Sequence, residues 1–221
     1  MKIDQLFETH NFATIMNACD DAQTNKRMIA IYGYPGAGKT SGLIQYARVK
    51  KNVYYLRVRK SMTDKDFYRA LLGVLGFKDV RNELSIHYLM NKLSNNLNMV
   101  RSNNLLIIDE AGKLKPRQLE YIHELRDLTQ STTGIVLAGP DYFSDNLDNW
   151  KEKGVIGIPE LVRRIQASIE LDPVTLDEVR EICKHYGITQ KRMVKYIKNN
   201  SENFSDVMNH VYRELLKRKM K

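Results

Sequence analysis

Short runs of apolar residues, each bounded by polar or turn-forming residues, recur five times along the chain. Runs of this length that lack a regular polar alternation are typical of strands buried in a parallel sheet. The five predicted strands cover residues 28–32, 52–58, 104–110, 134–139 and 167–171.

Amphipathic segments separate these runs and predict helices. In residues 61–76, Phe67, Leu71 and Val74 fall on one helical face, and Thr63 with Asp66 is typical of a capping box. Strands that alternate with helices predict an α/β fold, in which helices cover both faces of a five-stranded parallel sheet. The other helices predicted between the strands cover residues 41–51, 85–101 and 118–129.

The pattern changes after residue 173, where strands give way to three short amphipathic helices at about 175–187, 189–199 and 204–216. We therefore expect three parts. Residues 1–23 are predicted as a helical leader too short for a domain of its own, residues 24–173 as the α/β body, and residues 174–221 as a small helical lid that ends in a basic tail.

Residues 33–40 match the phosphate-loop pattern G-x-x-x-x-G-K-[ST], directly after the first predicted strand and before a helix. In that context glycines let the backbone approach a phosphate, and the N–H groups of the helix start point at it. Lys39 is predicted to bind the β- and γ-phosphates, and Thr40 to bind Mg²⁺. The predicted nucleotide-binding residues are Gly33, Tyr34, Pro35, Gly36, Ala37, Gly38, Lys39, Thr40 and Ser41.

A second chemical motif, Asp109-Glu110, ends the third apolar run. Parallel strands deliver such groups to the carboxyl edge of the sheet, where ligands bind. We expect Asp109 to hold Mg²⁺, and Glu110 to orient and deprotonate the water that attacks ATP. Together with the phosphate loop, this pair predicts an ATPase that uses ATP and Mg²⁺.

Three further polar sites accompany this pair. Asp141, just after the fourth strand, stands where a residue that senses the γ-phosphate is expected. Arg163 and Arg164 precede the fifth strand, and either can act as an arginine finger on a neighbouring subunit or be an ordinary surface residue.

The formal net charge is +9 and the isoelectric point is near 9.4, which favours a polyanionic partner such as DNA. Lys60, Lys113, Lys115 and Arg117 follow predicted strands near the active edge and are candidate DNA contacts. The alternative is that these residues belong to ordinary solvated turns.

Apolar runs long enough to span a bilayer and a secretory signal are both missing from the sequence, so a cytoplasmic protein that uses no membrane is expected. Cys19 and Cys183 lie far apart and do not have the spacing of metal ligands. We expect both to be reduced and structural.

The order of these motifs resembles that of AAA+ ATPases. Within that class, residues 24–171 are similar to the MuB- and TnsC-like transposition ATPases. The segments that carry this similarity are the phosphate loop at 33–40, the helix at 61–76, the strand and acidic pair at 105–111, the strand at 135–139 and the arginine segment at 161–165.

This resemblance implies an ATP-dependent oligomer on double-stranded DNA that recruits a transposase and is released on hydrolysis, with ATP bound between subunits. The leader is too short for the N-terminal DNA-binding domain of MuB, which leaves DNA contacts to the body or the tail. The lid has Ser205 and Asp206 where many relatives have a sensor arginine, and Arg213 is the nearest substitute. A replicative helicase loader of the IstB- or DnaC-like branch and a small-molecule P-loop kinase are the alternatives.

Overall fold

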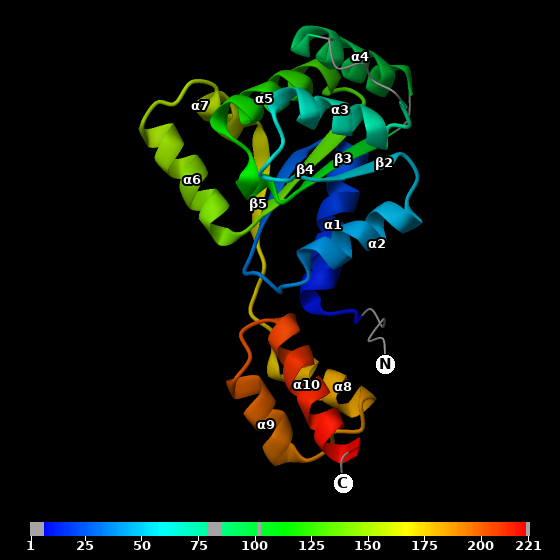
Figure 1. Cartoon of the computed structure of the whole chain (residues 1–221), viewed down its shortest axis with the longest axis vertical. Helices are drawn as coiled ribbons and strands as arrows, with labels where there is room; N and C mark the ends of the chain where they lie inside the picture. The colour runs from blue at the N-terminus through cyan, green and yellow to red at the C-terminus, as the bar shows by residue number, and fades with distance from the viewer. Residues whose placement is uncertain (1–6, 79–84, 101–102, 220–221) are drawn as a thin grey trace.

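A five-stranded parallel sheet forms the centre of the larger part of the chain in the computed structural model (Figure 1). The structure describes residues 7–78, 85–100 and 103–219. The spatial order of the strands is β2-β3-β4-β1-β5, and all neighbours are parallel. All five predicted strands are confirmed: β1 (Met28–Tyr32), β2 (Val53–Arg57), β3 (Asn104–Asp109), β4 (Thr133–Gly139) and β5 (Ile165–Glu170).

Helices cover both faces of this sheet, as predicted. Because side chains alternate along a strand, Met28 and Ala30 of β1 enter one core cluster, whereas Ile29 and Ile31 enter the other. The second cluster is closed by α1 (His10–Asn25) and α2 (Lys39–Val49). The first is closed by α3 (Asp64–Val74), α4 (Ile86–Met99), α5 (Pro116–Thr129), α6 (Asp141–Glu152) and α7 (Ile158–Arg164), with the short 3₁₀ helix η1 (Ala111–Lys113) before α5.

Two helices, α6 and α7, were not predicted from the sequence. The interior face of α6 is narrow, since only Phe143 and Leu147 of this helix are buried, and the polar residues around them hide the helical period. Tertiary contact of these two side chains with the sheet core is what makes the segment a helix.

The leader also differs from its expected form. The helix α1 continues to Asn25, so the expected boundary after residue 23 falls inside it. Ile15, Cys19 and Ala22 are buried against the sheet, because the apolar face of α1 packs on α2 and β4. The leader is therefore a layer of the α/β body.

The last three helices form the lid, which stands apart from the sheet at one end of the molecule (Figure 1). They are α8 (Leu176–His185), α9 (Lys191–Asn199) and α10 (Phe204–Lys219), and they enclose their own core around residues such as Ile182, Ile197 and Val211. Cys19 and Cys183 are both buried and free, as expected. No helix within the described ranges is both long and apolar enough to cross a membrane.

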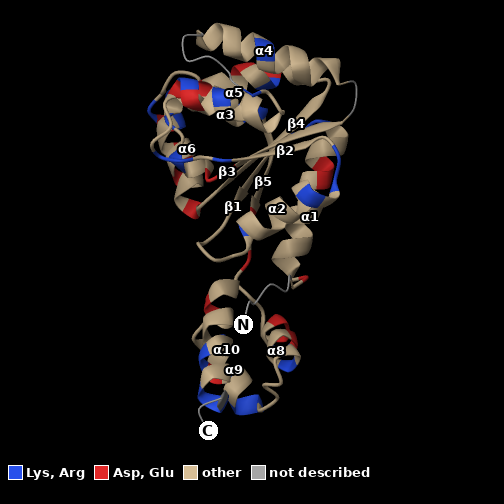
Figure 2. Cartoon of the chain, turned by 45° about the vertical axis from the view of Figure 1, so that its right-hand side comes forward, with Lys and Arg blue, Asp and Glu red and all other residues tan. Residues whose placement is uncertain are grey.

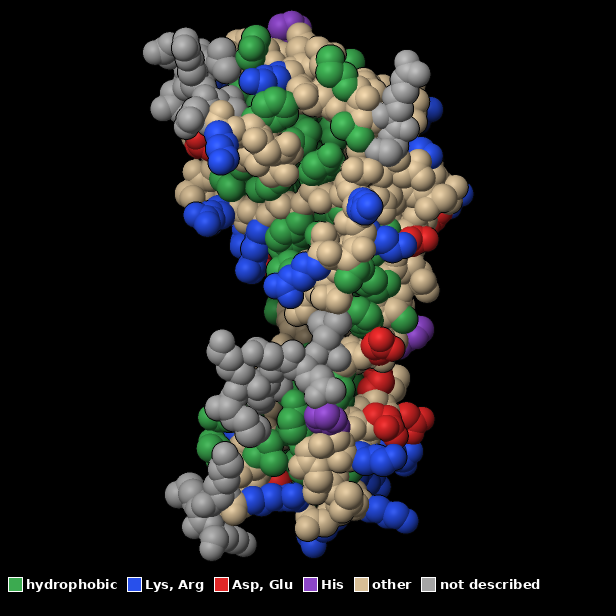
Figure 3. Space-filling view, turned by 90° about the vertical axis from the view of Figure 1, so that its right-hand side faces the viewer, with side chains coloured by type: hydrophobic (Ala, Val, Ile, Leu, Met, Phe, Trp, Pro, Cys, Tyr) green, Lys and Arg blue, Asp and Glu red, His purple; other side chains and the backbone are tan. Residues whose placement is uncertain are grey.

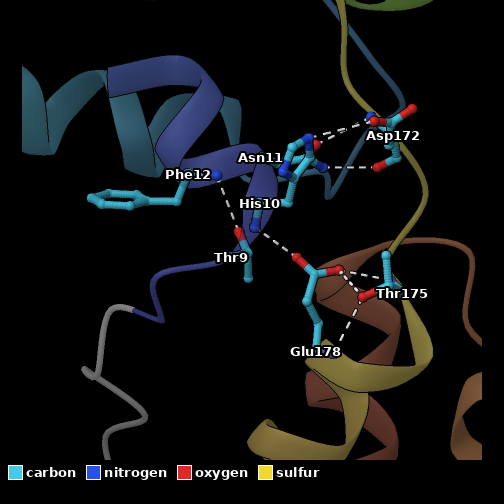
Figure 4. A network of polar contacts seen from close by, with 7 residues as sticks. All are labelled: Thr9, His10, Asn11, Phe12, Asp172, Thr175 and Glu178. Atoms are coloured by element: carbon cyan, nitrogen blue, oxygen red, sulfur yellow. Dashed lines mark hydrogen bonds and ion pairs between the residues drawn. The ribbon is translucent and has the colours of Figure 1, made fainter. Parts of the chain in front are cut away.

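Polar contacts at the start of α1 tie the lid to the body (Figure 4). The amide of Asn11 donates a hydrogen bond to the backbone carbonyl of Asp172 at 2.8 Å and accepts one from its N–H at 3.1 Å. The backbone N–H of His10 donates to Glu178 of α8 at 2.7 Å. The ring of Phe7 lies against His185 in the lid, with the ring centroids 5.3 Å apart. The leader therefore fixes the linker between β5 and α8.

Because α1 packs closely on β4, adding a single methyl group at Gly134 is expected to destabilise the protein. A Cβ added at Gly134 would lie 1.9 Å from the backbone oxygen of Ala22, so Gly134→Ala forces the helix away from the strand. We expect it to lower the free energy of unfolding by at least about 1–3 kcal/mol, measured by urea denaturation.

Gly73→Ala is the matched control. Nothing lies within 4 Å of a Cβ at Gly73, which sits inside α3, so this change should raise the free energy of unfolding by about 0.5–1 kcal/mol. A Gly134→Ala protein as stable as the parent would contradict the packing of α1 on β4.

Candidate nucleotide-binding site

Three segments that were separate in the sequence meet at the carboxyl edge of the sheet. The phosphate loop follows β1, Asp109 ends β3, and Pro140 follows β4. Ligands of parallel α/β folds bind at this edge, and here the edge holds a cleft of about 440 Å³. The cleft is lined by Pro35, Gly36, Gly38, Lys39, Thr40, Ser41, Arg57, Asp109, Glu110, Gly139, Pro140, Tyr142 and Ser205.

The phosphate loop has the backbone that its glycines permit. Gly36 and Gly38 have φ of 88° and 94°, in the left-handed region that favours glycine, and α2 begins directly after Gly38. The first N–H groups of α2 therefore face the cleft without partners in the helix, as an anion site requires.

Lys39 folds back over this loop. Its ammonium donates hydrogen bonds to the carbonyl of Gly33 and, at 2.9 Å, to that of Tyr34. Burial lowers the pKa of Lys39, and the nearby carboxylates of Asp141 and Asp109 oppose that shift. A phosphate in the cleft would likewise favour the charged ammonium.

Six of the nine residues predicted to bind the nucleotide line the cleft, and three do not. Gly33 and Tyr34 support the loop through the carbonyls that hold Lys39. Ala37 is buried in the core beneath α1 and α2. These three residues therefore have a structural role, because they shape the loop and do not line the cleft.

The carboxylate of Asp109 is buried and joins three elements. It accepts hydrogen bonds from the Thr40 hydroxyl at 2.8 Å, from the Tyr55 hydroxyl at 2.7 Å and from the Glu110 N–H at 2.8 Å. The pKa of Tyr55 is raised, first by burial and then by this hydrogen bond. Hydroxyl and carboxylate oxygens are the ligands that Mg²⁺ prefers, so Thr40 and Asp109 fit the predicted metal site.

Glu110 has a strained backbone and an engaged side chain. Its φ of 61° and ψ of 35° lie in the left-handed region, which is uncommon for a residue other than glycine. Its carboxylate oxygens contact Arg57 at 2.8 Å and Lys113 at 3.1 Å. These cations, Arg57 first, hold the pKa of Glu110 below that of an ordinary glutamate, so in this arrangement Glu110 is a weak base.

The two expected sensors lie on different helices. Asp141 is the first residue of α6 and does not line the cleft, and its Oδ1 is buried with no hydrogen-bond partner among the described residues. Arg213 lies away from the nucleotide cleft, in a groove between α9 and α10. Asn203 and Ser205 are the lid residues that lie against Gly36 of the loop within the described ranges, and the N–H of Ser205 donates to the Gly36 carbonyl at 3.2 Å.

Neither candidate arginine finger lines the cleft of its own chain. Both precede Ile165, which pairs with Met28 at the start of β1, whereas the phosphate loop follows the end of that strand. The guanidinium of Arg164 donates to both carboxylate oxygens of Asp127, at 2.8 and 3.1 Å. Arg163 is exposed. Within one subunit, the cleft therefore receives no arginine from this segment.

The structure brings the four candidate DNA contacts to one side of the active edge. The loop that contains Lys60 lies beside the start of α5, where Arg117 pairs with Asp64 at 3.6 Å. All four side chains are exposed. Lys113 also pairs with Glu110 at 3.1 Å, so one of the four contacts the acidic pair directly.

A family model described as AAA domain matches residues 22–147, more than half of the chain. The chain belongs to the AAA domain family. Membership implies nucleotide binding and, in general, nucleotide hydrolysis. This AAA+ fold agrees with the predicted one, and the matched residues include the phosphate loop and Asp109-Glu110.

Solved structures of similar fold include the Aeropyrum pernix ORC1 protein in complex with DNA, at 15% identity and a TM-score of 0.68 over 96% of this chain and 62% of that one. The Aeropyrum pernix ORC2 protein with ADPNP and ADP is 13% identical, with a TM-score of 0.70 over 99% of this chain and 65% of that one. The replication initiator DnaA bound to AMPPCP and single-stranded DNA is 19% identical, with a TM-score of 0.61 over 97% of this chain and 66% of that one.

At these identities the likeness shows the fold alone, and the chain spans less than two thirds of the length of each of these proteins. No curated protein matches the chain.

Tyr55 and Arg57 were predicted only as residues of a strand, and Ser205 only as a position where relatives have a sensor arginine. Arg57 was visible only as a charged residue in an apolar run, and its role depends on the register that places it opposite Asp109 on the neighbouring strand. The order of strands in a sheet cannot be predicted from one sequence, so the role of Arg57 could be recognised only from the folded sheet.

Removing Arg57 should raise the pKa of Glu110. Arg57→Ala deletes the largest cause of the lowered value, so the pKa is expected to move up toward that of an ordinary glutamate. A ¹³C NMR titration of the glutamate carboxyls, with Glu110 assigned from a Glu110→Gln variant, measures the change.

Because the folded pKa is the lower one, the stabilisation from this ion pair is present above the unfolded pKa and is lost as pH falls through the folded value. Arg59→Ala removes an exposed cation two residues away and should leave the titration unchanged. An unaltered pKa in Arg57→Ala would show that the two side chains are not paired in solution.

Proposed function

We propose that the chain is an ATP-dependent DNA-binding ATPase that oligomerises on duplex DNA and recruits or activates a transposase at target DNA, with hydrolysis driving disassembly. The observation that carries this proposal is a cleft that gathers Lys39, Thr40, Asp109 and Glu110, while neither Arg163 nor Arg164 of the same chain lines it. In the proposed oligomer, a second copy supplies the arginine finger.

The residues of the cleft have complementary roles in this proposal. The loop N–H groups and Lys39 bind the phosphates, and Glu110 orients and deprotonates the attacking water. Thr40 and Asp109 would hold Mg²⁺, which neutralises charge on the phosphates when bound. The contacts from Arg57 and Lys113 lower the basicity of Glu110, so proton transfer needs Glu110 to leave at least one of these cations.

Arg163 is the better of the two candidate fingers. Arg164 is committed to Asp127 through two hydrogen bonds, and breaking that ion pair would oppose its movement to another subunit. Arg163 is exposed at the same end of α7, and the described residues offer its side chain no ion pair. In the proposed oligomer, Arg163 reaches the γ-phosphate bound by the next copy.

DNA as the partner is supported by the net charge of +9 and by the exposed Lys60 and Lys115 near the active edge. The ORC1 and DnaA structures of similar fold each contain DNA. The transposase is supported by the resemblance of the motifs to those of MuB- and TnsC-like ATPases. Capture of a hexameric helicase, with weak duplex binding, would instead favour a helicase loader.

Assembly on DNA should depend on ATP. Electron microscopy of the protein with duplex DNA is expected to show filaments or rings with ATP or a non-hydrolysable analogue, and none with ADP. Glu110→Gln should retain ATP binding, lose hydrolysis by about 10²-fold or more, and give assemblies that last longer. Wild-type protein that fails to assemble on DNA at low salt with ATP would refute the proposal.

A mixing experiment tests whether the site is shared between copies. Arg163→Ala and Glu110→Gln should each hydrolyse ATP poorly alone, the first by about 10³-fold or more. In a mixed oligomer, the intact cleft of the Arg163→Ala copy receives Arg163 from its neighbour, so phosphate release should recover. Arg164→Ala is the matched control and should keep activity. A mixture no more active than its components would exclude sharing through Arg163.

A further inference from the structure

The lid carries a concentration of positive charge that the nucleotide site does not use. Residues 174–221 contain eleven Lys and Arg against six Asp and Glu, a surplus of five in less than a quarter of the chain. Figures 2 and 3 show Lys and Arg gathered at the end of the lid that points away from the sheet, with Asp and Glu nearer the body. The charge is therefore segregated within the lid.

A groove of about 660 Å³ runs between α8 and α9 at this basic end. Two rows of cations face it. Arg180 and Lys184 lie one helical turn apart on α8, and Lys191, Lys195 and Lys198 follow the i, i+4, i+7 spacing along one face of α9. The geometry therefore presents positive charge along both walls of one channel.

Few of these cations are neutralised by the protein. Arg180 pairs with Asp177 at 2.5 Å, whereas Lys184 and the three lysines of α9 have no ion pair among the described residues. Among the described residues that line the groove, Glu181 is the one that is acidic. Like charges at this spacing repel each other, and a polyanion between the rows would relieve that repulsion.

The N-terminus of α9 adds to this field. The helix begins at Lys191, its N-cap residue Gln190 makes no side-chain capping hydrogen bond, and its first turn holds no acidic residue. The orphan N–H groups and the positive end of the helix dipole therefore favour an anion at the mouth of the groove.

We infer that the groove between α8 and α9 binds the phosphate backbone of duplex DNA. This inference rests on the proposed function, because it assumes that the protein binds DNA, and it assigns the contact to the lid. The apolar floor, formed by Leu176, Ile188 and Val194, suits the sugar edge of a backbone whose phosphates lie along the cationic walls. The contacts read no base, so binding is independent of sequence.

The lid also touches the nucleotide site. The N–H of Ser205 in α10 donates to the carbonyl of Gly36 in the phosphate loop, and α10 shares one core with α8 and α9. DNA held by the lid is thus linked through a single packed unit to the loop that binds ATP.

The test compares two variants that each lose three positive charges. Lys191→Gln/Lys195→Gln/Lys198→Gln empties one wall of the groove and keeps side chains of similar helix propensity. Lys51→Gln/Lys151→Gln/Lys153→Gln removes three exposed lysines of the body, outside the groove and the cleft. Fluorescence anisotropy with a labelled duplex, in the presence of a non-hydrolysable ATP analogue, is measured at several salt concentrations.

The groove variant should bind duplex DNA at least about tenfold more weakly at low salt. The negative slope of log K against log salt should become less steep by about 3. The body variant should show a much smaller loss. Both variants should bind a fluorescent ATP analogue as the wild type does, because Lys39 and the cleft are unchanged, and this reports an intact fold.

Two failures are distinguishable. Wild-type protein that binds no DNA would sink the proposed function itself. Wild-type protein that binds DNA, with equal affinity and salt slope in the groove variant, would overturn the lid assignment alone. A double variant at Lys60 and Lys115 that loses DNA binding in that case would move the contact to the body.

Discussion

A carboxylate buried at the end of β3, that of Asp109, accepts hydrogen bonds from α2, β2 and the backbone of Glu110. A buried carboxylate without such partners would be costly, so the position of each donor is constrained. Thr40 fixes the start of α2 against the sheet, and Tyr55 fixes β2. The phosphate loop, the predicted Mg²⁺ ligands and Glu110 all take their positions from this one group.

The same edge of the sheet is also linked to the lid by two contacts far apart in the sequence. Ser205 meets the phosphate loop at Gly36, and Asn11 of the leader clamps the linker at Asp172. Since α1 is packed on the sheet, the clamp transmits the position of the body to α8. A change in the loop on nucleotide binding would therefore meet a lid that is held at two points.

Acidic and basic residues are concentrated in different parts of the molecule. At the carboxyl edge of the sheet, Asp109 and Glu110 line the same cleft as Lys39. Basic residues of the lid line the groove between α8 and α9 that we propose as the DNA contact. The charge of Glu110 is neutralised in the isolated chain by ion pairs with Arg57 and Lys113. Any partner that draws these cations away would restore its basicity.

The sequence alone determined the five strands, the phosphate loop and the Asp109-Glu110 pair, because each depends on local composition over a few residues. It also determined the α/β class. The tertiary structure decided what depends on strand order and packing: the contact of Arg57 with Glu110, the commitment of Arg164 to Asp127, and the helices α6 and α7. These features join residues that only the folded sheet brings together, and a linear pattern carries no record of which strand lies beside which.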